Sequence, residues 1–424
     1  MPLVLVGCLS INYINVMETY YLSNIFSNRW FVLVVTGVAL VLSLTTWYSA
    51  TAVIPELTEL MSLSLSQAAW FTNSVQLGFV ISALIVSLLS LLDIYKSSTI
   101  MAISACFAGI ANAFLILEPG VVLSLLSRFI TGMALAGIYP TVIKFIATWF
   151  KKGRGFAMGI MLSALTLGSA LPHLIRAVGV QFDWKLVIVM SSLACLIASV
   201  LFAFVLHDGP HQFSKTKADL NQLTRIIRNR PVMLANIGYF GHMWELYAMW
   251  GWFFAYAIAA KSTGLGLENA ALLTFFVIAA GAPGCVLGGW LADRIGRCYA
   301  TTFFMVISGT SALLIGLCFN GPPWLFITIA LIWGLTAVAD SAQCSAAVTE
   351  LSEQSMVGSA LALQMGVGFA ITIFVIWLLP VLAEYFGNWR WVFLILAPGP
   401  FLGVLSMLLL RGEDRSLLLA DGRR

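Results

Sequence analysis

Charge is what this chain has least of. Only 9% of its 424 residues are charged, with 22 Lys and Arg against 18 Asp and Glu, whereas soluble domains carry roughly 25%. So few charges cannot cover a water-facing surface, which excludes an ordinary soluble domain. The net charge of +4 does not indicate a nucleic-acid-binding surface, and we expect no nucleic-acid partner.

The sequence also lacks the motifs of metal, nucleotide and catalytic sites. Its seven cysteines include no C-x-x-C pair, so neither a zinc site nor a disulfide framework is expected. No G-x-x-x-x-G-K-[ST] loop occurs, and the four histidines form no H-E-x-x-H motif. We therefore expect no cofactor, no metal and no enzymatic activity.

Apolar residues are abundant instead, at 60% of the chain. Segments of about 20 apolar residues can each cross a bilayer as a helix, and lipid is therefore the solvent for most of the exterior. The sequence predicts an all-α membrane protein with twelve such spans, at about 31–54, 70–92, 99–117, 121–145, 155–178, 185–206, 232–256, 270–291, 299–319, 324–348, 357–383 and 391–410.

One long polar break divides the spans into two sets of six. It runs from His207 to Pro231 and contains a short basic amphipathic stretch, 220–228, that we expect to lie on the membrane surface. The predicted organisation is a leader that is poorly ordered or interfacial (1–28), a first bundle (29–206), a cytoplasmic linker (207–231), a second bundle (232–410) and a cytoplasmic tail (411–424).

The basic residues predict the orientation. With both termini in the cytoplasm, 16 of the 22 Lys and Arg fall in inner segments, 4 in outer loops and 2 within a span. This bias follows the positive-inside rule. The short loops favour a bacterial inner membrane.

Internal repeats relate the two halves. The loop at Gly289–Arg297 has a weaker copy at Leu89–Lys96, with Asp293 lying 200 positions after Asp93. Trp184 and Trp389 precede equivalent spans, as do Gly155 and Gly358. Three matches at nearly one offset indicate two related six-span bundles, an arrangement typical of transporters.

These residues resemble the major facilitator superfamily. The second loop matches the superfamily's G-x-x-x-D-R-x-G-R signature, and Arg128-x-x-x-Gly132 is similar to its fourth-helix pattern. The stretch 149–159 resembles members that carry small organic or inorganic anions. The resemblance implies two pseudo-symmetric six-helix bundles that alternate access to a central site. The first-half loop departs from the pattern, with Leu89 in place of glycine.

The signature loop is the predicted cytoplasmic gate. We expect Gly289 to permit close helix contact and Gly296 to permit a turn that a Cβ would hinder. An acidic side chain there can rest against the N-terminal end of the eleventh span, and the arginines can reach acidic or carbonyl partners. The alternative is a tight turn that only anchors the loop. The gating residues are Gly289, Asp293, Arg294, Gly296, Arg297 and, in the first half, Asp93.

Charged groups inside a span are costly and often functional. Arg128 and Tyr139 fall on nearly one helical face and could meet an anion, or Arg128 could bond carbonyls of a neighbouring helix. His242 lies three residues before Glu245, which suits either a proton-coupling pair or a hydrogen bond between helices.

Further candidates come from the other spans. Asp340, with Gln343 one turn on, would by the resemblance face the cavity opposite Arg128, or would pair with a cation to hold the bundle. Trp47, Tyr48 and Tyr247 could form aromatic walls, with Trp250, or could pack as ordinary apolar residues.

The function expected from these features is secondary active transport of a small solute, favoured to be an organic or inorganic anion, driven by protons across the bilayer. Proton-coupled efflux of drug-like amphipathic compounds is the alternative, and a transporter-like sensor is a third. Counterflow in proteoliposomes separates a carrier from a sensor.

Overall fold

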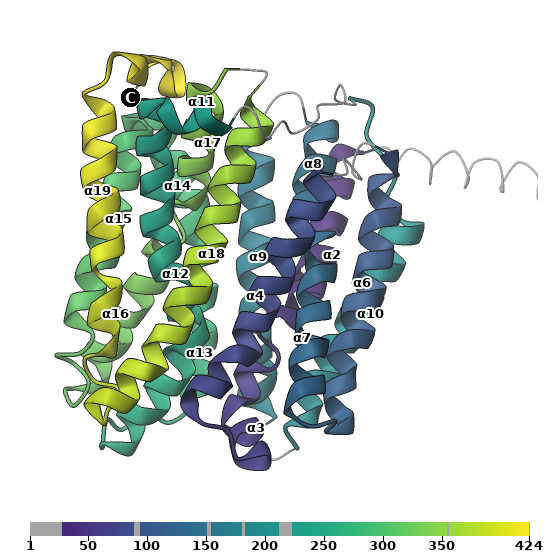
Figure 1. Cartoon of the computed structure of the whole chain (residues 1–424), viewed down its shortest axis with the longest axis vertical. Coiled ribbons are helices and arrows are strands. Elements are labelled where there is room, and N and C mark those ends of the chain that lie inside the picture. The colour runs from purple at the N-terminus through teal and green to yellow at the C-terminus, as the bar shows by residue number, and fades with distance from the viewer. Residues whose placement is uncertain are drawn as a thin grey trace, which may run out of the picture.

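The computed structural model describes residues 28–88, 94–150, 154–179, 183–211, 223–353 and 356–423. Every regular element in these ranges is a helix (Figure 1). Long apolar runs favour this outcome, because in lipid a helix satisfies all of its own backbone hydrogen bonds. The predicted leader lies outside the described residues, apart from its last residue, Asn28, which caps the first helix.

The elements before residue 207 pack on one another as one group. In this first group α4 packs on α7, α6 on α10, and α2 on both α9 and α10. Its elements are α2 (Arg29–Tyr48), η1 (Thr51–Val53), α3 (Ile54–Met61), α4 (Leu65–Leu88), α6 (Ser97–Ala113), η2 (Phe114–Leu117), α7 (Val121–Ala136), α8 (Tyr139–Trp149), α9 (Arg154–Val178) and α10 (Lys185–Phe204).

The elements after the linker form a second group. Here α12 packs on α18 and α19, and α15 packs on α16 and α19. Its elements are α11 (Leu223–Arg228), α12 (Arg230–Ser262), α13 (Ala270–Ala279), α14 (Gly281–Ile295), α15 (Arg297–Leu314), α16 (Pro323–Thr336), α17 (Ser341–Leu351), α18 (Val357–Phe386), η4 (Val392–Leu396), α19 (Pro398–Arg411) and η5 (Asp414–Gly422).

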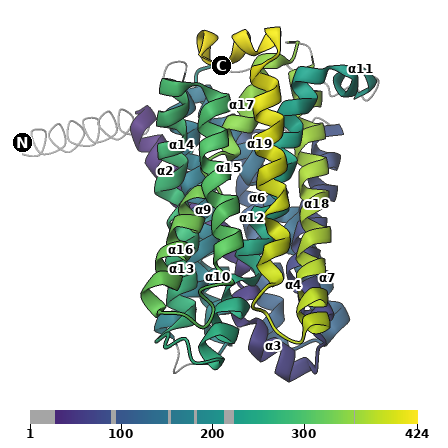
Figure 2. The same cartoon turned by 90° about the vertical axis from the view of Figure 1, so that its left-hand side faces the viewer.

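The two groups stand side by side and meet along two seams (Figure 1). In one seam α4 lies against α18, and the Asn73 amide donates to the carbonyl of Ile373 at 3.0 Å. In the other, α9 lies against α13 and α14, and the Ser163 hydroxyl donates to the carbonyl of Ala282 at 2.8 Å. The short helices α11 and η5 cap one end of the molecule, and α3 lies at the other (Figure 2).

Ten helical segments in the described part are long and apolar enough to cross a membrane. Their outer faces carry large exposed apolar side chains, such as Val122 at 77% and Phe204 at 78% exposure, which is the pattern expected of a surface that faces lipid rather than water. The ten do not include α12 and α15. The structure is therefore that of a multi-pass membrane protein.

One close crossing of helices recurs at the equivalent place in the two groups. A Cβ on Gly132 of α7 would lie 2.0 Å from the carbonyl oxygen of Val75 on α4, and one on Gly334 of α16 would lie 1.8 Å from that of Val277 on α13. Both residues of the second pair lie 202 positions after their counterparts. Only glycine lets the backbones approach so closely, and the same device positions both crossings.

The helix that carries each of these glycines ends a few residues later, and a new helix begins after a short break at nearly the same relative position in the two groups. The break falls between Ala136 and Tyr139 in the first group, and between Thr336 and Ser341 in the second. The sequence predicts one unbroken span in each case, because apolar residues continue on both sides of each break, although Asp340 lies in the second. Pro140, in the first turn of α8, cannot donate a backbone hydrogen bond, which suits the start of a new helix.

Candidate functional site

Aromatic side chains from both groups meet between them. The ring of Trp47 on α2 lies 4.9 Å from Phe79 on α4, 6.0 Å from Tyr247 on α12 and 6.3 Å from Phe369 on α18. Phe79 and Phe369, from opposite groups, are 4.7 Å apart. All four side chains are buried. The predicted wall residues Trp47 and Tyr247 thus lie in one cluster that joins the two groups.

Tyr48 and Trp250 make a second contact between the groups, edge-on at 6.1 Å. The Trp47 and Trp250 indole nitrogens and the Tyr48 hydroxyl are buried without a hydrogen-bond partner among the described residues. An indole N–H can only donate a hydrogen bond. A buried donor that has no acceptor destabilises the folded protein by about 1–3 kcal/mol.

Other interior indoles of the described part have acceptors. Trp244 donates to the carbonyl of Ile395, Trp252 to that of Ile376, and Trp333 to Glu245, at 2.8, 2.8 and 2.7 Å. Among the buried indoles of the described part, the two without an acceptor, those of Trp47 and Trp250, both lie where the two groups of helices meet.

Arg128 is fully buried on α7 and bonds the end of α2. Its guanidinium donates to the carbonyls of Thr46 and Trp47 at 2.9 and 2.7 Å, and to the amide oxygen of Asn112 at 2.6 Å. The last carbonyls of a helix have no partner within it, and a cation there is favourable. Arg128 thus holds the backbone that carries Trp47 and Tyr48.

Tyr139 follows a short interruption of the helix that carries Arg128, and the sharing of one helical face by the two residues stays a prediction. The helix of Arg128 ends at Ala136, and Tyr139 begins α8 after the break. Continuous helical geometry does not apply across the interruption. Tyr139 is partly exposed, and its role in substrate binding or coupling stays a prediction.

His242 lies against Asp340 rather than against Glu245. Nδ1 of His242 and Oδ1 of Asp340 are 2.8 Å apart, and both side chains are almost wholly buried. Neither atom is aligned for a hydrogen bond. Asp340 occupies the break between α16 and α17, where irregular backbone brings it to α12. This arrangement places two titratable groups in contact inside the second group.

Glu245 is bound by two donors from its own group of helices. The Trp333 indole donates to Oε1 at 2.7 Å, and the Ser308 hydroxyl donates to Oε2. The carboxyl is 2% exposed. The expected contact with His242, one turn away on α12, is replaced by these bonds to α15 and α16. Helix spacing alone brings two residues to one face but does not select between neighbours on it.

Further buried side chains without a hydrogen-bond partner in the described part of the chain include two glutamines and a histidine. Both amide atoms of Gln76 on α4 and of Gln364 on α18 are unpaired, as are both ring nitrogens of His173 on α9. The His173 ring lies edge-on to Phe254 at 5.5 Å, one turn of α12 beyond Trp250. The sequence reasoning missed Gln76 and His173, although a polar side chain inside an apolar span is a signal that would find them.

The signature loop links the ends of α14, α15 and α17. Arg297 donates to both carboxylate oxygens of Glu350, at 2.7 and 2.5 Å, and to the amide oxygen of Gln343 at 2.7 Å. Gln343 therefore bonds to the loop arginine, although the sequence grouped it with Asp340. Glu350 was not among the predicted residues, and it is the acidic partner in this network.

Other residues of the predicted gate are close to the surface. Asp293 is exposed, and its backbone carbonyl accepts from Arg423. The guanidinium of Arg294 lies 4.0 Å from the centre of the Trp290 ring. Gly296 has a φ of +88°, the conformation for which glycine was expected. Asp93 lies outside the described residues.

The predicted reason for Gly289 is wrong. A Cβ on Gly289 would meet no atom within 4 Å, whereas one on Gly284 or Gly288 would lie 2.0 Å from the carbonyl oxygen of Leu335 or Ala339. The close helix contact therefore belongs to the face of α14 that carries those two glycines. Gating by this loop stays a prediction.

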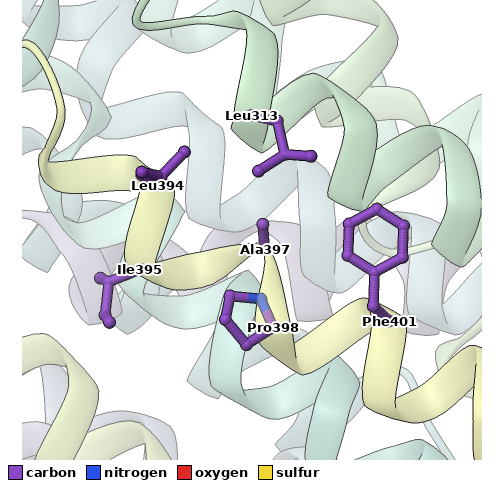
Figure 3. Close-up of a pocket in the computed structure, with 6 residues that line it drawn as sticks. All are labelled: Leu313, Leu394, Ile395, Ala397, Pro398 and Phe401. Carbon is purple, nitrogen blue, oxygen red and sulfur yellow. The ribbon is translucent and has the colours of Figure 1, made fainter.

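A hollow of about 480 Å³ lies at the outer side of the second group, where η4 turns into α19 (Figure 3). Its lining consists only of apolar residues: Leu313, Leu394, Ile395, Ala397, Pro398 and Phe401. It offers no polar group to orient a solute, so the candidate site is the polar and aromatic interior rather than this hollow.

Apolar helices in two packed groups, with buried ionisable and unpaired polar side chains between and within them, define a membrane carrier. The chain belongs to the Major Facilitator Superfamily, whose family model matches residues 35–339 and 287–422. This confirms the resemblance seen in the sequence and the expectation of a transporter rather than an enzyme.

Proteins similar to this chain are named as transporters or resistance proteins. The chain is 25% identical over 243 residues to the "Probable sulfoacetate transporter SauU" of Cupriavidus necator, a match that covers 53% of this chain and 55% of the relative. It is 30% identical over 175 residues to "MFS-type transporter pytF" of Aspergillus terreus, covering 39% and 55%.

A third relative is the "Fosmidomycin resistance protein" of Escherichia coli, 25% identical over 297 residues, covering 69% of this chain and 71% of the relative. The chain spans about half of the length of the first two relatives that it matches. Their names therefore support a transporter, and the solute is a separate question.

Proposed function

We propose that this protein is a proton-coupled secondary transporter of a small organic or inorganic anion, working by alternating access in a bacterial inner membrane. Its twelve spans form two six-helix bundles, with both termini cytoplasmic and boundaries at 29–206 and 232–410. Helices α12 and α15 supply the two spans beyond the ten that are apolar by composition. The polar side chains of α12, including His242 and Glu245, account for its lower apolar content.

Structural repetition supports the two-bundle arrangement. The Val75–Gly132 and Val277–Gly334 crossings and the two interrupted helices recur at nearly one sequence offset. Related halves that rock against each other expose a site between them to one side and then to the other. The two seams described above are the surfaces along which such rocking takes place.

The observation that carries the coupling proposal is the set of buried ionisable groups on the second bundle. His242 and Asp340 lie 2.8 Å apart, and Glu245 is held by Trp333 and Ser308. An ionised group at such depth is costly, and we therefore assign the coupled proton to this set of groups. Protonation of Asp340 or Glu245 releases its partners and changes the contacts that hold α16, α17 and α12 together.

The anion proposal is supported by the relative named as a sulfoacetate transporter and by the unpaired donors beside Arg128. Efflux of drug-like amphipathic compounds is the second candidate, favoured by the aromatic cluster and by the relative named for fosmidomycin resistance. Ligand-induced thermal stabilisation across a panel of small anions and cationic drugs separates the two.

The coupling test uses purified protein in proteoliposomes with an imposed pH gradient. In Glu245→Gln and Asp340→Asn we expect gradient-driven uptake of the selected anion to fall at least about tenfold, while counterflow exchange, which needs no net proton movement, continues. Glu384→Gln, at an exposed position, is the matched control and should behave as wild type. Unchanged gradient-driven uptake in both variants would remove these residues from the coupling mechanism.

A further inference from the structure

We propose that the transported anion is bound by neutral donors, the indole N–H groups of Trp47 and Trp250 and the hydroxyl of Tyr48, and that Arg128 supplies positive charge behind them without touching the anion. This proposal rests on the anion transport proposed above and assigns the residues that recognise the anion.

The three donors share an unusual condition. Each side chain is at most 1% exposed, and each donor lacks an acceptor among the described residues. Buried polar groups are nearly always paired, so an unpaired one needs an explanation. The interior indoles of Trp244, Trp252 and Trp333 all have acceptors, which shows that this interior can satisfy an indole where the role is structural.

The donors lie close together and come from both halves. The Tyr48 ring is 6.1 Å from Trp250, while Tyr247 is 6.0 Å from Trp47 and 5.7 Å from Trp250. Trp250 lies on α12 and occupies nearly the position that Trp47 occupies on α2, 203 residues earlier. An acceptor held between them therefore contacts both halves at once, as a transported solute must.

The position of Arg128 makes the electrostatic potential at the site positive. Its guanidinium is bonded to the carbonyls of Thr46 and Trp47 and to Asn112, and no acidic side chain in the described part is paired with it. Its charge thus remains uncompensated directly behind the two residues whose side chains donate. In an apolar interior such a charge acts over several ångströms, and it favours an anion over a neutral acceptor.

Tyr48→Phe is the cleanest test, because it removes only a hydroxyl. Removing an unpaired buried group does not destabilise a protein, so without anion the variant should melt at or above the wild-type temperature. Its affinity for sulfoacetate, measured by calorimetric titration of the detergent-purified full chain, should fall about 10-fold or more, because a hydrogen bond to a charged group is lost.

Tyr256→Phe is the matched control. The Tyr256 hydroxyl donates to the carbonyl of Arg390 at 3.0 Å, away from the proposed donors. Its removal should lower the melting temperature and leave sulfoacetate affinity unchanged. A Tyr48→Phe protein that binds sulfoacetate as wild type does would overturn the role of the hydroxyl.

Trp47 and Trp250 need replacements that keep the shape of the ring. Benzothienylalanine at either position substitutes sulfur for the N–H, and each substitution should weaken sulfoacetate binding about 10- to 100-fold. The same substitution at Trp252 should not. If affinity survives at both Trp47 and Trp250, the neutral-donor site is wrong. If the wild type binds none of the small anions in the panel, the proposed anion transport itself fails.

Discussion

At the scale of single residues, Arg128 fixes the end of α2. Its hydrogen bonds satisfy two backbone carbonyls that have no helical partner, and each hydrogen bond to a charged group contributes about 1.5–3 kcal/mol. We expect Arg128→Met to lower the free energy of unfolding by about 3 kcal/mol or more, and Arg128→Lys by less, because an ammonium can still donate to one carbonyl. Thermal unfolding in detergent measures both.

Arg225→Met is the control for that experiment. Arg225 is exposed on α11, so the same loss of charge should leave the melting temperature nearly unchanged. Equal melting temperatures for Arg128→Met and Arg225→Met would contradict a bracing role for Arg128.

Several buried polar residues could be identified from the sequence, but their partners could not. A polar side chain in an apolar span is visible in the sequence, which is why Arg128, Glu245 and Asp340 could be singled out. Whether His242 meets Glu245 or Asp340 depends on how α12 packs against the break between α16 and α17, and no local pattern encodes that packing.

At the scale of elements, the glycine crossings hold pairs of helices at their closest distance. Gly132→Ala and Gly334→Ala would each place a methyl group about 2 Å from a backbone oxygen, at 2.0 and 1.8 Å, and the helices must separate to accommodate it. We expect both variants to lose a similar number of degrees in melting temperature.

Gly159→Ala provides the comparison, because a Cβ there meets no atom within 4 Å and alanine favours the helix by about 1 kcal/mol. It should melt at or above wild type. If Gly132→Ala or Gly334→Ala is equally stable, the crossing is not as tight as described.

The C-terminal element η5 contacts α17 at the residue that also binds the signature loop. Its Ala420 N–H donates to Glu350 at 3.1 Å, the same carboxylate that binds Arg297. Leu419 is fully buried in a cluster with Cys298 of α15 and Ala347 of α17. The segment lies across the end of the second group in Figure 2, so its removal should loosen the end of α17.

This contact can be tested by thiol labelling in a variant whose only cysteine is Cys298. Leu419→Asp places a charge in the cluster, and maleimide labelling of Cys298 should become several-fold faster. Leu418→Asp, at a 58% exposed neighbour, adds the same charge without entering the cluster and should label slowly. Equal rates in the two variants would show that η5 does not cover α15.

Element boundaries followed from the sequence where hydropathy changes and failed where it does not. The start of α7 and both ends of α9 agree with the apolar runs, and α11 lies within the predicted surface stretch. The interruptions after Ala136 and Thr336 are hidden, because apolar residues continue on both sides of each, and a single Pro140 or Asp340 does not end an apolar span in the sequence.

At the scale of the whole molecule, two groups of helices are in contact along two seams. The family and the membrane location were predictable from composition, repeats and the signature loop. The charge network was not, since it joins residues that are distant in the chain, such as Arg297 and Glu350. Rocking of the two bodies requires the seams to open at one end during each transport cycle.

A cross-link across one seam tests this most directly. The Asn269 amide donates to the carbonyl of Ala177 at 3.2 Å, joining the start of α13 to the end of α9. In a background without native cysteines, Ala177→Cys with Asn269→Cys should form a disulfide that stops counterflow of the anion in proteoliposomes, and reductant should restore it. A control pair within one body, Ala102→Cys with Ser199→Cys, whose native hydrogen bond is 2.7 Å, should cross-link and still transport. Undiminished counterflow through protein cross-linked at 177 and 269 would contradict alternating access by rocking halves.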